Sequence, residues 1–487
     1  MQNVIVIMAD SWRFDYLGCY GNDWIKTPNI DQFAQESILF ENAYAEGCPT
    51  VPTRKTLFTG RYTLPVCGWG PLQNKDIVVA DILWRDNIRS ALISDTGVMH
   101  FPGYGYERGF NFIQVLRGQQ WDPFYRNLPC ELEIEKYHKP VWDPKSKRRK
   151  RETHYSLFTR REILDYLPFR QTWTGEQDQM VARVSNTTID YLDTKYNKNN
   201  PLFLWIDSFD PHEPWDPPSV WDPELDYLYD PGYEGLEVIN PVATFSDGYL
   251  TEEETHHVRM LYAEKITMVD RWIGKILEKL KEMELYDNSL IIFLSDHGEP
   301  LGNGVHGHGI MRKCRPWPYE ELSHIPLIIH HPHGINGKLS TFVETVDIAP
   351  TILDFFDIKR QRKQMQGTSL LPIIKGEVEK IKDFAISGYF GFSWSIIQAD
   401  YSYIHWLDQK EIDEQQVSSM YGWTKLNEDT SVWTCTPGSI PETPKIDELY
   451  DRQKDQFQLN NLIDLHPDLA KKLHQKLRDF LLQMKTC

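Results

Sequence analysis

The sequence has no apolar run long enough to cross a lipid bilayer, which argues against a membrane-spanning protein. It has only seven cysteines in 487 residues, an odd number without Cys-x-x-Cys spacing. Neither a disulfide framework nor a zinc–thiolate cluster is therefore expected. The opening MQNVIVIMAD enters an apolar run without the basic segment and cleavage site of a signal peptide. Together these absences favour reduced thiols and a cytoplasmic location.

Basic residues are also scarce. The chain carries 52 Lys and Arg against 70 Asp and Glu, a formal net charge of −18. Phosphate contacts require Lys and Arg, so this balance argues against a nucleic-acid partner. One run opposes the trend, PKSKRRKRE at residues 144–152. We interpret it as a solvated insertion loop; the alternatives are an anion patch or a segment that draws an anionic substrate toward a cleft.

Internal repeats and low-complexity tracts are absent as well. Hydrophobic residues make up 41% of the chain and charged residues 25%, as in an ordinary globular protein. The length exceeds what one core usually holds, so we expect two subdomains. Aromatic residues reach 13%, which fits either a large packed core or aromatic walls around a ligand cleft.

Apolar runs alternate with helical patterns over the first 375 residues or so. The stretch Thr251–Glu284 carries its apolar residues on one helical stripe, with Thr251 as the N-cap, and Thr27–Ala45 also shows helical spacing. This alternation predicts an α/β fold with a mostly parallel central sheet flanked by helices. The predicted strands are Asn3–Asp10, Ile88–Asp95, Pro201–Asp210, Asn288–Asp296 and Ile325–Pro332.

The pattern changes after the segment GTSLLPIIKGE. Residues 384–407 are typical of short strands joined by turns, and PDLAKKLHQKLRDFLLQM predicts a closing amphipathic helix. We therefore predict a catalytic domain over residues 1–380 and a smaller C-terminal α+β subdomain over residues 381–487.

Candidate catalytic groups follow several of the predicted strands. In open α/β sheets ligands bind at the carboxyl ends of the strands, where Asp10 and Asp296 are expected. With His297, these residues offer carboxylate and imidazole ligands that suit Mn, Zn, Ca or Mg. A cation there would activate a nearby nucleophile and polarise a phosphoryl or sulfuryl oxygen. The segment CPTVPTRKTLFTGR, residues 48–61, contains three candidate nucleophiles: Cys48, Thr50 and Thr53.

These segments resemble, in order and over nearly the whole chain, the sulfatase family of the alkaline-phosphatase superfamily. The resemblance rests on NVIVIMADSWRFDYLGCYGNDWIKTPNIDQFA, DNSLIIFLSDHGEPLG, VDIAPTILDFF and GTSLLPIIKGE. It implies an alkaline-phosphatase-like fold. The family's active-site motif is Cys or Ser, any residue, Pro, any residue, Arg, and then Thr-Gly. The segment TVPTRKTLFTG fits it with Thr50 in the nucleophile position, followed by Pro52 and Arg54.

The threonine is a departure from the family pattern. In sulfatases the Cys or Ser is oxidised to formylglycine, but the methyl group on the Cβ of Thr50 prevents the same oxidation from giving an aldehyde. No formylglycine is therefore expected. The resemblance implies instead that Thr50 binds the metal and attacks directly, as Thr or Ser does in phosphatases and phosphodiesterases of the superfamily.

The resemblance also implies roles for other side chains. Asp10, Asp296 and His297 match metal ligands, while Ser11 stands where a further acid or amide ligand is usual. Arg54 would orient Thr50 and offset charge. His212 matches the histidine that contacts the ester or protonates the leaving group. Lys313 matches the lysine that binds the anionic oxygens of the substrate.

A lysine and a histidine that the family usually carries after the second predicted strand are missing from SDTGVMHF, where His100 is a candidate substitute. His308 and His306 are candidates for lining the pocket or for a second metal site. Asp210 is interpreted as a group that positions the loop of His212, and Asp207 and Asp210 are alternatives for a second metal site.

We therefore predict a metal-dependent hydrolase of phosphate or phosphonate esters, with diesters favoured and Thr50 as the nucleophile. One alternative is a sulfatase that acts without formylglycine, and another is a catalytically inactive anion-binding member of the family. The expected partner is a small anionic ester, with a sugar, aryl or lipid-headgroup moiety left open. No nucleic acid and no membrane are expected as partners, and a homo-oligomer is left open.

Overall fold

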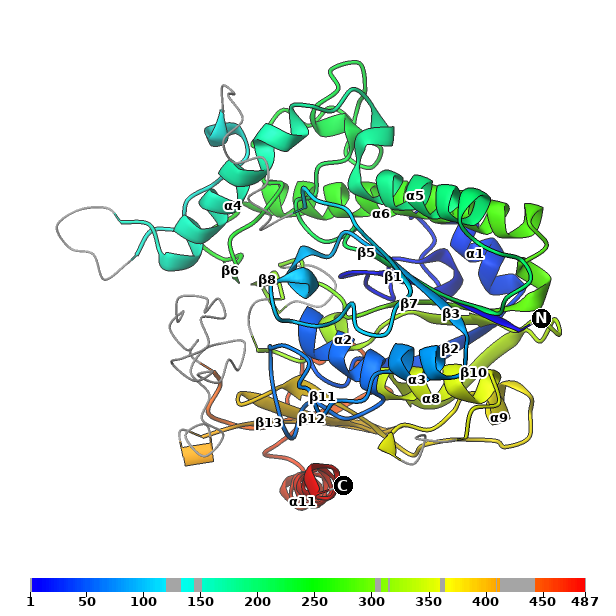
Figure 1. The fold of residues 1–487 in the computed structure, drawn as a ribbon. Helices are drawn as coiled ribbons and strands as arrows, with labels where there is room; N and C mark the ends of the chain where they lie inside the picture. The colour runs from blue at the N-terminus through cyan, green and yellow to red at the C-terminus, as the bar shows by residue number, and fades with distance from the viewer. Residues whose placement is uncertain are drawn as a thin grey trace.

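The computed structural model describes residues 2–119, 133–143, 151–302, 308–313, 316–359, 364–408, 410–411 and 443–486. Its centre is an eight-stranded sheet in the order β10-β2-β9-β7-β1-β5-β3-β4 (Figure 1). All neighbouring pairs are parallel except the two that β9 makes with β2 and β7. The bounds are β1 Asn3–Ala9, β2 Ile38–Tyr44, β3 Arg89–Ser94, β4 Phe112–Val115, β5 Leu202–Ser208, β7 Ser289–Ser295, β9 Leu327–His330 and β10 Gly337–Glu344.

The predicted α/β class with a mostly parallel sheet is confirmed. Strand β1 shows why its sequence is apolar at every position, since successive side chains alternate between the two faces of the sheet. Val4, Val6 and Met8 belong to one buried cluster, whereas Ile5 and Ile7 belong to the cluster on the opposite face. A strand covered by helices on both faces has no solvent-facing side to occupy with polar residues.

Helices form a layer on each face of the sheet (Figure 1). On one face lie α1 Pro28–Gln35, α5 Met180–Thr194 and α6 Glu252–Glu282, and on the other α2 Thr50–Thr59, α3 Val79–Arg85 and α8 Ile348–Phe355. Further elements of the described residues are the helices α4 His154–Arg170, α7 Glu320–Ser323 and α9 Leu371–Ile374, and the small strand pair β6 Thr244–Phe245 and β8 Ile310–Met311.

The helical reading of Thr27–Ala45 is wrong in its second half. Helix α1 ends at Gln35, and Ile38 begins β2. Ile38 is spaced to continue the apolar stripe of Ile30 and Phe33, but its β-branched side chain starts the run ILFENAY, which pairs with both β9 and β10. Strand pairing therefore overrides a short helical periodicity here.

Helix α6 follows its prediction closely. It spans Glu252–Glu282, and Thr251 is the N-cap of a complete capping box with Glu254. Thr251 Oγ1 accepts from the Glu254 N–H at 3.1 Å, and Glu254 Oε2 accepts from the Thr251 N–H at 2.8 Å. Its apolar stripe is buried against the sheet, as predicted, through Val258, Leu261, Tyr262, Ile266, Val269, Ile273, Ile276 and Leu280.

A second, antiparallel sheet forms the C-terminal part. It has the order β11-β12-β13-β14, with β11 Ala385–Tyr389, β12 Ser393–Ile397, β13 Tyr401–Trp406 and β14 Glu448–Asp451. The closing helix α11, Pro467–Thr486, packs on this sheet (Figure 1). The predicted short strands and closing helix are thus confirmed, while the exact boundary at residues 380 and 381 stays a prediction.

Three further expectations can be compared with the described residues. No helix among them is long and apolar enough to span a membrane. Cys19, Cys48 and Cys67 are free thiols, and the other four cysteines lie outside the described residues. Most of the basic run at 144–152 also lies outside them, so its role stays open, as does the predicted cytoplasmic location.

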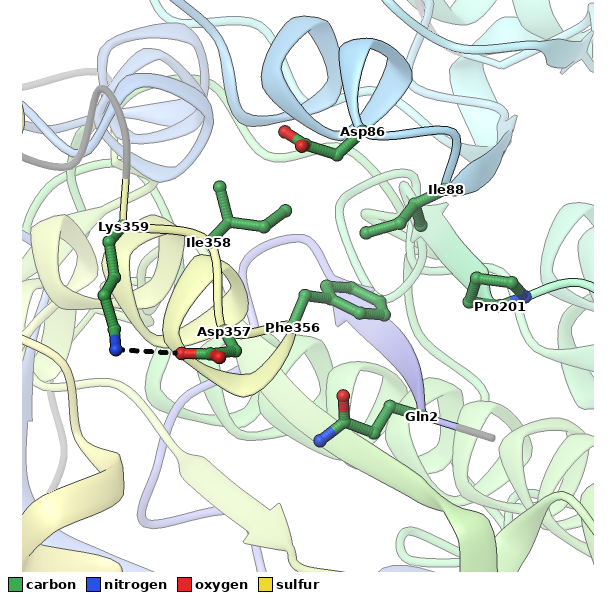
Figure 2. Close-up of a pocket in the computed structure, with 8 residues that line it drawn as sticks. All are labelled: Gln2, Asp86, Ile88, Pro201, Phe356, Asp357, Ile358 and Lys359. Atoms are coloured by element: carbon green, nitrogen blue, oxygen red, sulfur yellow. Dashed lines mark ion pairs between the residues drawn. The ribbon is translucent and has the colours of Figure 1, made fainter.

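A hollow of about 610 Å³ lies at the edge of the sheet opposite to the predicted catalytic groups (Figure 2). Gln2, Ile88 and Pro201 line it, and each directly precedes a parallel strand. The hollow is therefore at the amino ends of β1, β3 and β5. Asp10, Asp296 and His297 follow the carboxyl ends, so the candidate site lies at the opposite edge.

We predict that Thr251→Ala loosens the start of α6. Losing an N-cap hydrogen bond costs about 1 kcal/mol, which corresponds to about fivefold faster opening of the first helical turn. Hydrogen exchange followed by mass spectrometry should show this in the peptide that begins at residue 251. Thr194→Ala, at the exposed last residue of α5, is the control and should leave that peptide unchanged. Equal exchange in both variants would contradict the prediction.

Candidate active site

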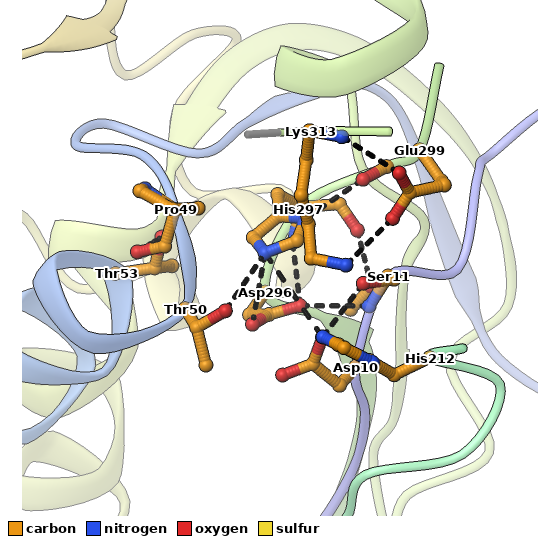
Figure 3. Close-up of polar contacts among 12 residues, drawn as sticks. Asp10, Ser11, Pro49, Thr50, Thr53, His212, Asp296, His297, Glu299 and Lys313 are labelled. Carbon is orange, nitrogen blue, oxygen red and sulfur yellow. Dashed lines mark hydrogen bonds and ion pairs between the residues drawn. The ribbon is translucent and has the colours of Figure 1, made fainter. Parts of the chain in front are cut away.

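Parallel pairing places the predicted metal ligands side by side. Ala9 of β1 is in register with Ser295 of β7, so the next residues, Asp10 and Asp296, leave the sheet at the same edge. The Asp296 Oδ1 atom accepts hydrogen bonds from the backbone N–H groups of Ser11 (3.0 Å) and His297 (2.8 Å). One ligand atom each of Asp10, Asp296 and His297 lies within 4.8 Å of the others, and all three side chains are buried (Figure 3).

The tautomer of His297 suits a metal ligand. Its Nδ1 lies 2.7 Å from the carbonyl oxygen of Gly298, an acceptor, so Nδ1 carries the proton and donates it. Burial lowers the pKa of His297 to about 4, so the ring is neutral and Nε2 carries a lone pair. This Nε2 lies 3.5 Å from Asp296 Oδ2 and 4.0 Å from Asp10 Oδ1.

The donor set therefore fits a divalent cation. Three electron-rich atoms, one each from Asp10, Asp296 and His297, face one another in a buried space. Burial, with the nearby Asp296 carboxylate, raises the pKa of Asp10 to about 7, so a nearby positive charge favours its ionised form. Ser11 donates to Asp10 Oδ1 at 2.7 Å and orients that carboxylate.

Arg54 supplies part of that positive charge. Its guanidinium is fully buried, and Nη1 lies 2.9 Å from Asp10 Oδ2 and 2.5 Å from Asp296 Oδ2. The other side of the guanidinium binds Asp207 in a bidentate pair, with Nε–Oδ2 at 3.0 Å and Nη2–Oδ1 at 2.7 Å. These carboxylates hold the pKa of Arg54 well above its usual range despite burial.

Asp207 is thus the partner of Arg54 in this structure, a role that sequence reasoning missed. The signal was available, because Asp207 occupies the penultimate position of β5, whose neighbour β1 delivers Asp10 to the same edge. Thr96, just beyond β3, also donates to Asp207 Oδ1 at 2.8 Å. Four strands therefore contribute to one charge cluster around a single guanidinium.

Thr50 is the candidate nucleophile that faces these groups. It is the first residue of α2, and its Oγ1 lies 3.2 Å from His297 Nε2 (Figure 3). Thr53 instead donates its hydroxyl to the Gly47 carbonyl at 2.6 Å. The Sγ of Cys48 lies 3.8 Å from Ser387 Oγ, and burial raises the pKa of this thiol to about 12. The geometry therefore favours the same residue as the sequence motif.

Lys313 lies in a second charge cluster, beside the first (Figure 3). Its Nζ is 2.8 Å from Glu213 Oε2 and 2.7 Å from Glu299 Oε2, and its backbone N–H donates to Glu299 Oε1 at 2.7 Å. Arg312 also contacts Glu213. Sequence reasoning missed both glutamates, although each stands within two residues of a predicted histidine, in DPHEP and SDHGEP.

His212 is held as a neutral ring. It stacks on Phe209, with ring centroids 3.9 Å apart, and its Nδ1 donates to the carbonyl of Glu213 at 2.7 Å. Burial lowers the pKa of His212 well below its usual value, with Lys313 and Arg312 adding to the shift. The Nε2 atom of His212 is therefore a lone-pair acceptor. A proton for a leaving group would have to reach it first.

The remaining predicted residues lie in different settings. His100 is largely buried, its pKa is lowered by desolvation, and its Nε2 has no hydrogen-bond partner among the described residues. His308 stacks on Tyr319 and contacts the Gln458 carbonyl and Glu321 through its two nitrogens. The substrate-binding roles of His100 and His308 stay predictions, and His306 lies outside the described residues.

Asp210 sits where a loop-positioning group is expected. Its Oδ2 accepts the backbone N–H of Val181 at 2.9 Å, and its Oδ1 lies 3.3 Å from Lys265 Nζ. These contacts tie the segment that carries His212 to α5 and α6.

Comparisons with known proteins identify the family. The family model "Sulfatase" matches residues 2–358, and the model "N-sulphoglucosamine sulphohydrolase, C-terminal" matches residues 307–415. An arylsulfatase of Clostridium perfringens is 28% identical over 406 residues, covering 78% of this chain and 80% of its own. The multifunctional alkaline phosphatase superfamily protein PehA of Trinickia caryophylli is 27% identical over 418 residues, covering 77% of each.

Solved structures share the fold. The phosphonate monoester hydrolase of Agrobacterium radiobacter superposes with a TM-score of 0.67 at 21% identity, covering 99% of this chain and 96% of its own. A protein crystallised with D-glucosamine-2-N,6-O-disulfate superposes with a TM-score of 0.63 at 20% identity, covering 99% and 98%. At these identities the likeness establishes the architecture, including the second sheet, and leaves the ester type open.

We predict that Arg54→Met destabilises the fold strongly. The substitution leaves the carboxylates of Asp10, Asp207 and Asp296 buried without their cation, which should cost about 3–5 kcal/mol of unfolding free energy. Urea denaturation of the metal-free protein measures this loss. Arg183→Met is the control, because that guanidinium is 33% exposed and lies 3.7 Å from Asp178, so its loss should cost less than about 1 kcal/mol. Equal midpoints for the two variants would overturn the assignment.

Proposed function

The chain belongs to the sulfatase family, and from the geometry around Thr50 we propose that it hydrolyses phosphate or phosphonate esters, diesters in particular, with Thr50 as the direct nucleophile. An ester hydrolase follows from the family itself. The proposed ester type rests on one observation. The group 3.2 Å from His297 and beside the buried carboxylates is a threonine hydroxyl, which cannot be converted to formylglycine.

Thr50 is placed to attack. It begins α2, where the helix dipole favours negative charge on an oxygen, and its hydroxyl lies 3.2 Å from His297 Nε2. Because the lone pair of that nitrogen would be used to hold the ion, the hydroxyl proton would pass to solvent water as Thr50 attacks. Its oxygen would form a bond to phosphorus while the bond to the leaving oxygen breaks, and the leaving group would depart with the electron pair. Water would then attack phosphorus, release Thr50 and return its proton.

A divalent ion would be held by Asp10, Asp296, His297 and Thr50. When bound, it supplies Lewis-acid polarisation of the phosphoryl oxygen and lowers the pKa of the attacking hydroxyl. The geometry leaves the choice among Mn, Zn, Ca and Mg open, because two carboxylates and one imidazole suit each of them.

Lys313 is suited to hold the anionic oxygens of the ester. An ammonium group has three N–H donors, and two of them are directed to Glu213 and Glu299. The third is available for a substrate oxygen. The two glutamates also hold the charge of Lys313 in place, so the donor is oriented before the substrate arrives.

Two alternatives remain as outcomes of the same test. A sulfate ester has a similar shape, and relatives include sulfatases, so sulfate hydrolysis without formylglycine is the first alternative. A catalytically inactive anion-binding member is the second. The complete set of Asp10, Arg54, Asp296, His297 and Lys313 in one buried site argues against inactivity.

We predict that phosphorus esters are cleaved far faster than sulfate. Initial rates should be compared for a phosphodiester, a phosphonate monoester, a phosphomonoester and a sulfate with one chromogenic leaving group, each with added Mn, Zn, Mg or Ca. Thr50→Ala should lower turnover at least about a thousandfold, whereas Thr50→Ser should keep it. Thr53→Ser is the neighbouring control. Mass spectrometry of acid-quenched enzyme should find a phosphoryl group on the peptide that contains Thr50.

Each other outcome has a clear meaning. Faster sulfate hydrolysis would overturn the proposed ester type and favour the first alternative. Metal binding without turnover of any of the four esters would favour the inactive alternative. Chelation followed by addition of metal should remove and then restore the activity of the wild-type enzyme, because the attacking hydroxyl depends on the ion.

We predict that His212→Gln distinguishes the two roles considered for His212. If His212 protonates the leaving group, the substitution lowers kcat about 10²–10⁴-fold for poor leaving groups and little for good ones. If it only contacts the ester, the loss is the same for both and falls largely on KM. Because Nε2 is unprotonated in the structure, we expect the second pattern. A series of aryl esters of graded leaving-group pKa measures the slope.

A further inference from the structure

A second group of ligand-type side chains lies in the small sheet, outside the catalytic site. His405 is in β13, Asp447 directly precedes β14, and His474 is on α11. One donor atom of each lies within 4.8 Å of the others, and all three residues are half-buried. None belongs to the cluster around Thr50, and neither family motif nor catalysis explains why two imidazoles and a carboxylate meet here.

The contacts within this group are close on every side. His405 Nδ1 lies 3.0 and 3.1 Å from the two Asp447 oxygens, and its Nε2 lies 3.2 Å from Glu411 Oε2. The rings of His405 and His474 have centroids 4.6 Å apart at 81°. Ligands 2.0–2.2 Å from a tetrahedral zinc ion lie about 3.5 Å from one another, so small side-chain movements suffice to close around an ion.

Tyr403 orients two of these ligands. Its hydroxyl lies 2.5 Å from Asp447 Oδ2 and 3.0 Å from His474 Nδ1. A carboxylate only accepts, so the hydroxyl proton goes to Asp447, and His474 Nδ1 must donate its own proton to the hydroxyl oxygen. In the neutral ring, His474 Nε2 then carries a free lone pair. A metal-bound histidine typically has this arrangement, with its other nitrogen donating to a fixed neighbour.

We propose that His405, Asp447 and His474 form a binding site for a transition-metal ion of the zinc type. Glu411 would accept the proton of His405 Nε2, which leaves Nδ1, the nitrogen facing Asp447, as the ligand atom. Two imidazoles select zinc, nickel, cobalt or copper over magnesium and calcium, which prefer oxygen. A local turn also holds Glu411, since its Oε2 accepts the Asp408 N–H at 3.0 Å. The three ligands come from β13, the segment just before β14, and α11.

The ion would fasten the closing helix to the second sheet. Leu473 and Leu477 of α11 pack into the core of that sheet beside Ile396 and Tyr403. His474 therefore stands at the border of a buried helix face, where an ion could join it to β13. Because the site does not exist in the unfolded chain, binding would stabilise this packing. The role is structural and independent of the ester hydrolysis proposed above.

The test counts zinc in the full-length protein. Metal-free wild type, His474→Gln, Asp447→Asn and the control His466→Gln are each dialysed against buffered Zn²⁺ and analysed for bound metal. His466 immediately precedes α11, and its ring packs near Tyr401, outside the cluster. We expect His474→Gln and Asp447→Asn to bind one zinc equivalent fewer than wild type and His466→Gln. Zinc should also raise the thermal midpoint of wild type more than that of either ligand variant.

Two further measurements exclude trivial explanations. Ester hydrolysis should be unchanged in both ligand variants, which shows that they are folded and that the lost zinc is not the catalytic one. Tyr403→Phe should weaken zinc binding about 10–100-fold without removing a ligand. Equal zinc content in all four proteins would overturn the proposal. The group would then be an ion-pair cluster only, in which a protonated His405 donates to both Asp447 and Glu411.

Discussion

The structure depends on one buried guanidinium. Arg54 lies among Asp10, Asp207 and Asp296 at the carboxyl edge of the sheet, where no described side chain of the cluster reaches solvent. Three carboxylates cannot stay ionised together in such a place without compensation, because isolated buried charges are strongly disfavoured. Arg54 binds all three and joins α2 to the ends of β1, β5 and β7. A metal ion held by Asp10, Asp296 and His297 would complete the neutralisation.

This constraint also explains why Thr50 faces the site. Arg54 lies one helical turn after Thr50, and its Nη1 contacts the Thr50 carbonyl at 3.2 Å. The residue that balances the charge therefore fixes the position of the helix that carries Thr50, the proposed nucleophile. Lys313, balanced by Glu213 and Glu299, provides a second fixed positive charge. Both cations are in position before substrate binds, so little reorganisation is required during reaction.

Membership of the sulfatase family suggests a sulfate ester as substrate, whereas the chemistry of Thr50 suggests a phosphorus ester. The domain match covers most of the chain and includes relatives that act on sulfate esters. A threonine at position 50 cannot be oxidised to formylglycine, whereas the charged groups around it are those proposed to hold a tetrahedral anion. Which ester type is cleaved therefore depends on the chemistry of the attacking atom. The fold does not decide the ester type, because proteins that act on phosphonate esters and on sulfated sugars both have it.

The sequence by itself determined the fold class, the strand ends that carry Asp10 and Asp296, and the helix α6 with its cap, and it singled out Thr50 as the candidate nucleophile. These follow from local patterns: apolar runs, periodicity, capping residues and motif register. Only the tertiary structure decided that Asp207 binds Arg54, that Glu213 and Glu299 hold Lys313, and that β2 begins at Ile38. It also brought His405, Asp447 and His474 together from three separate elements. Such pairings depend on which strands become neighbours, and no local pattern records that.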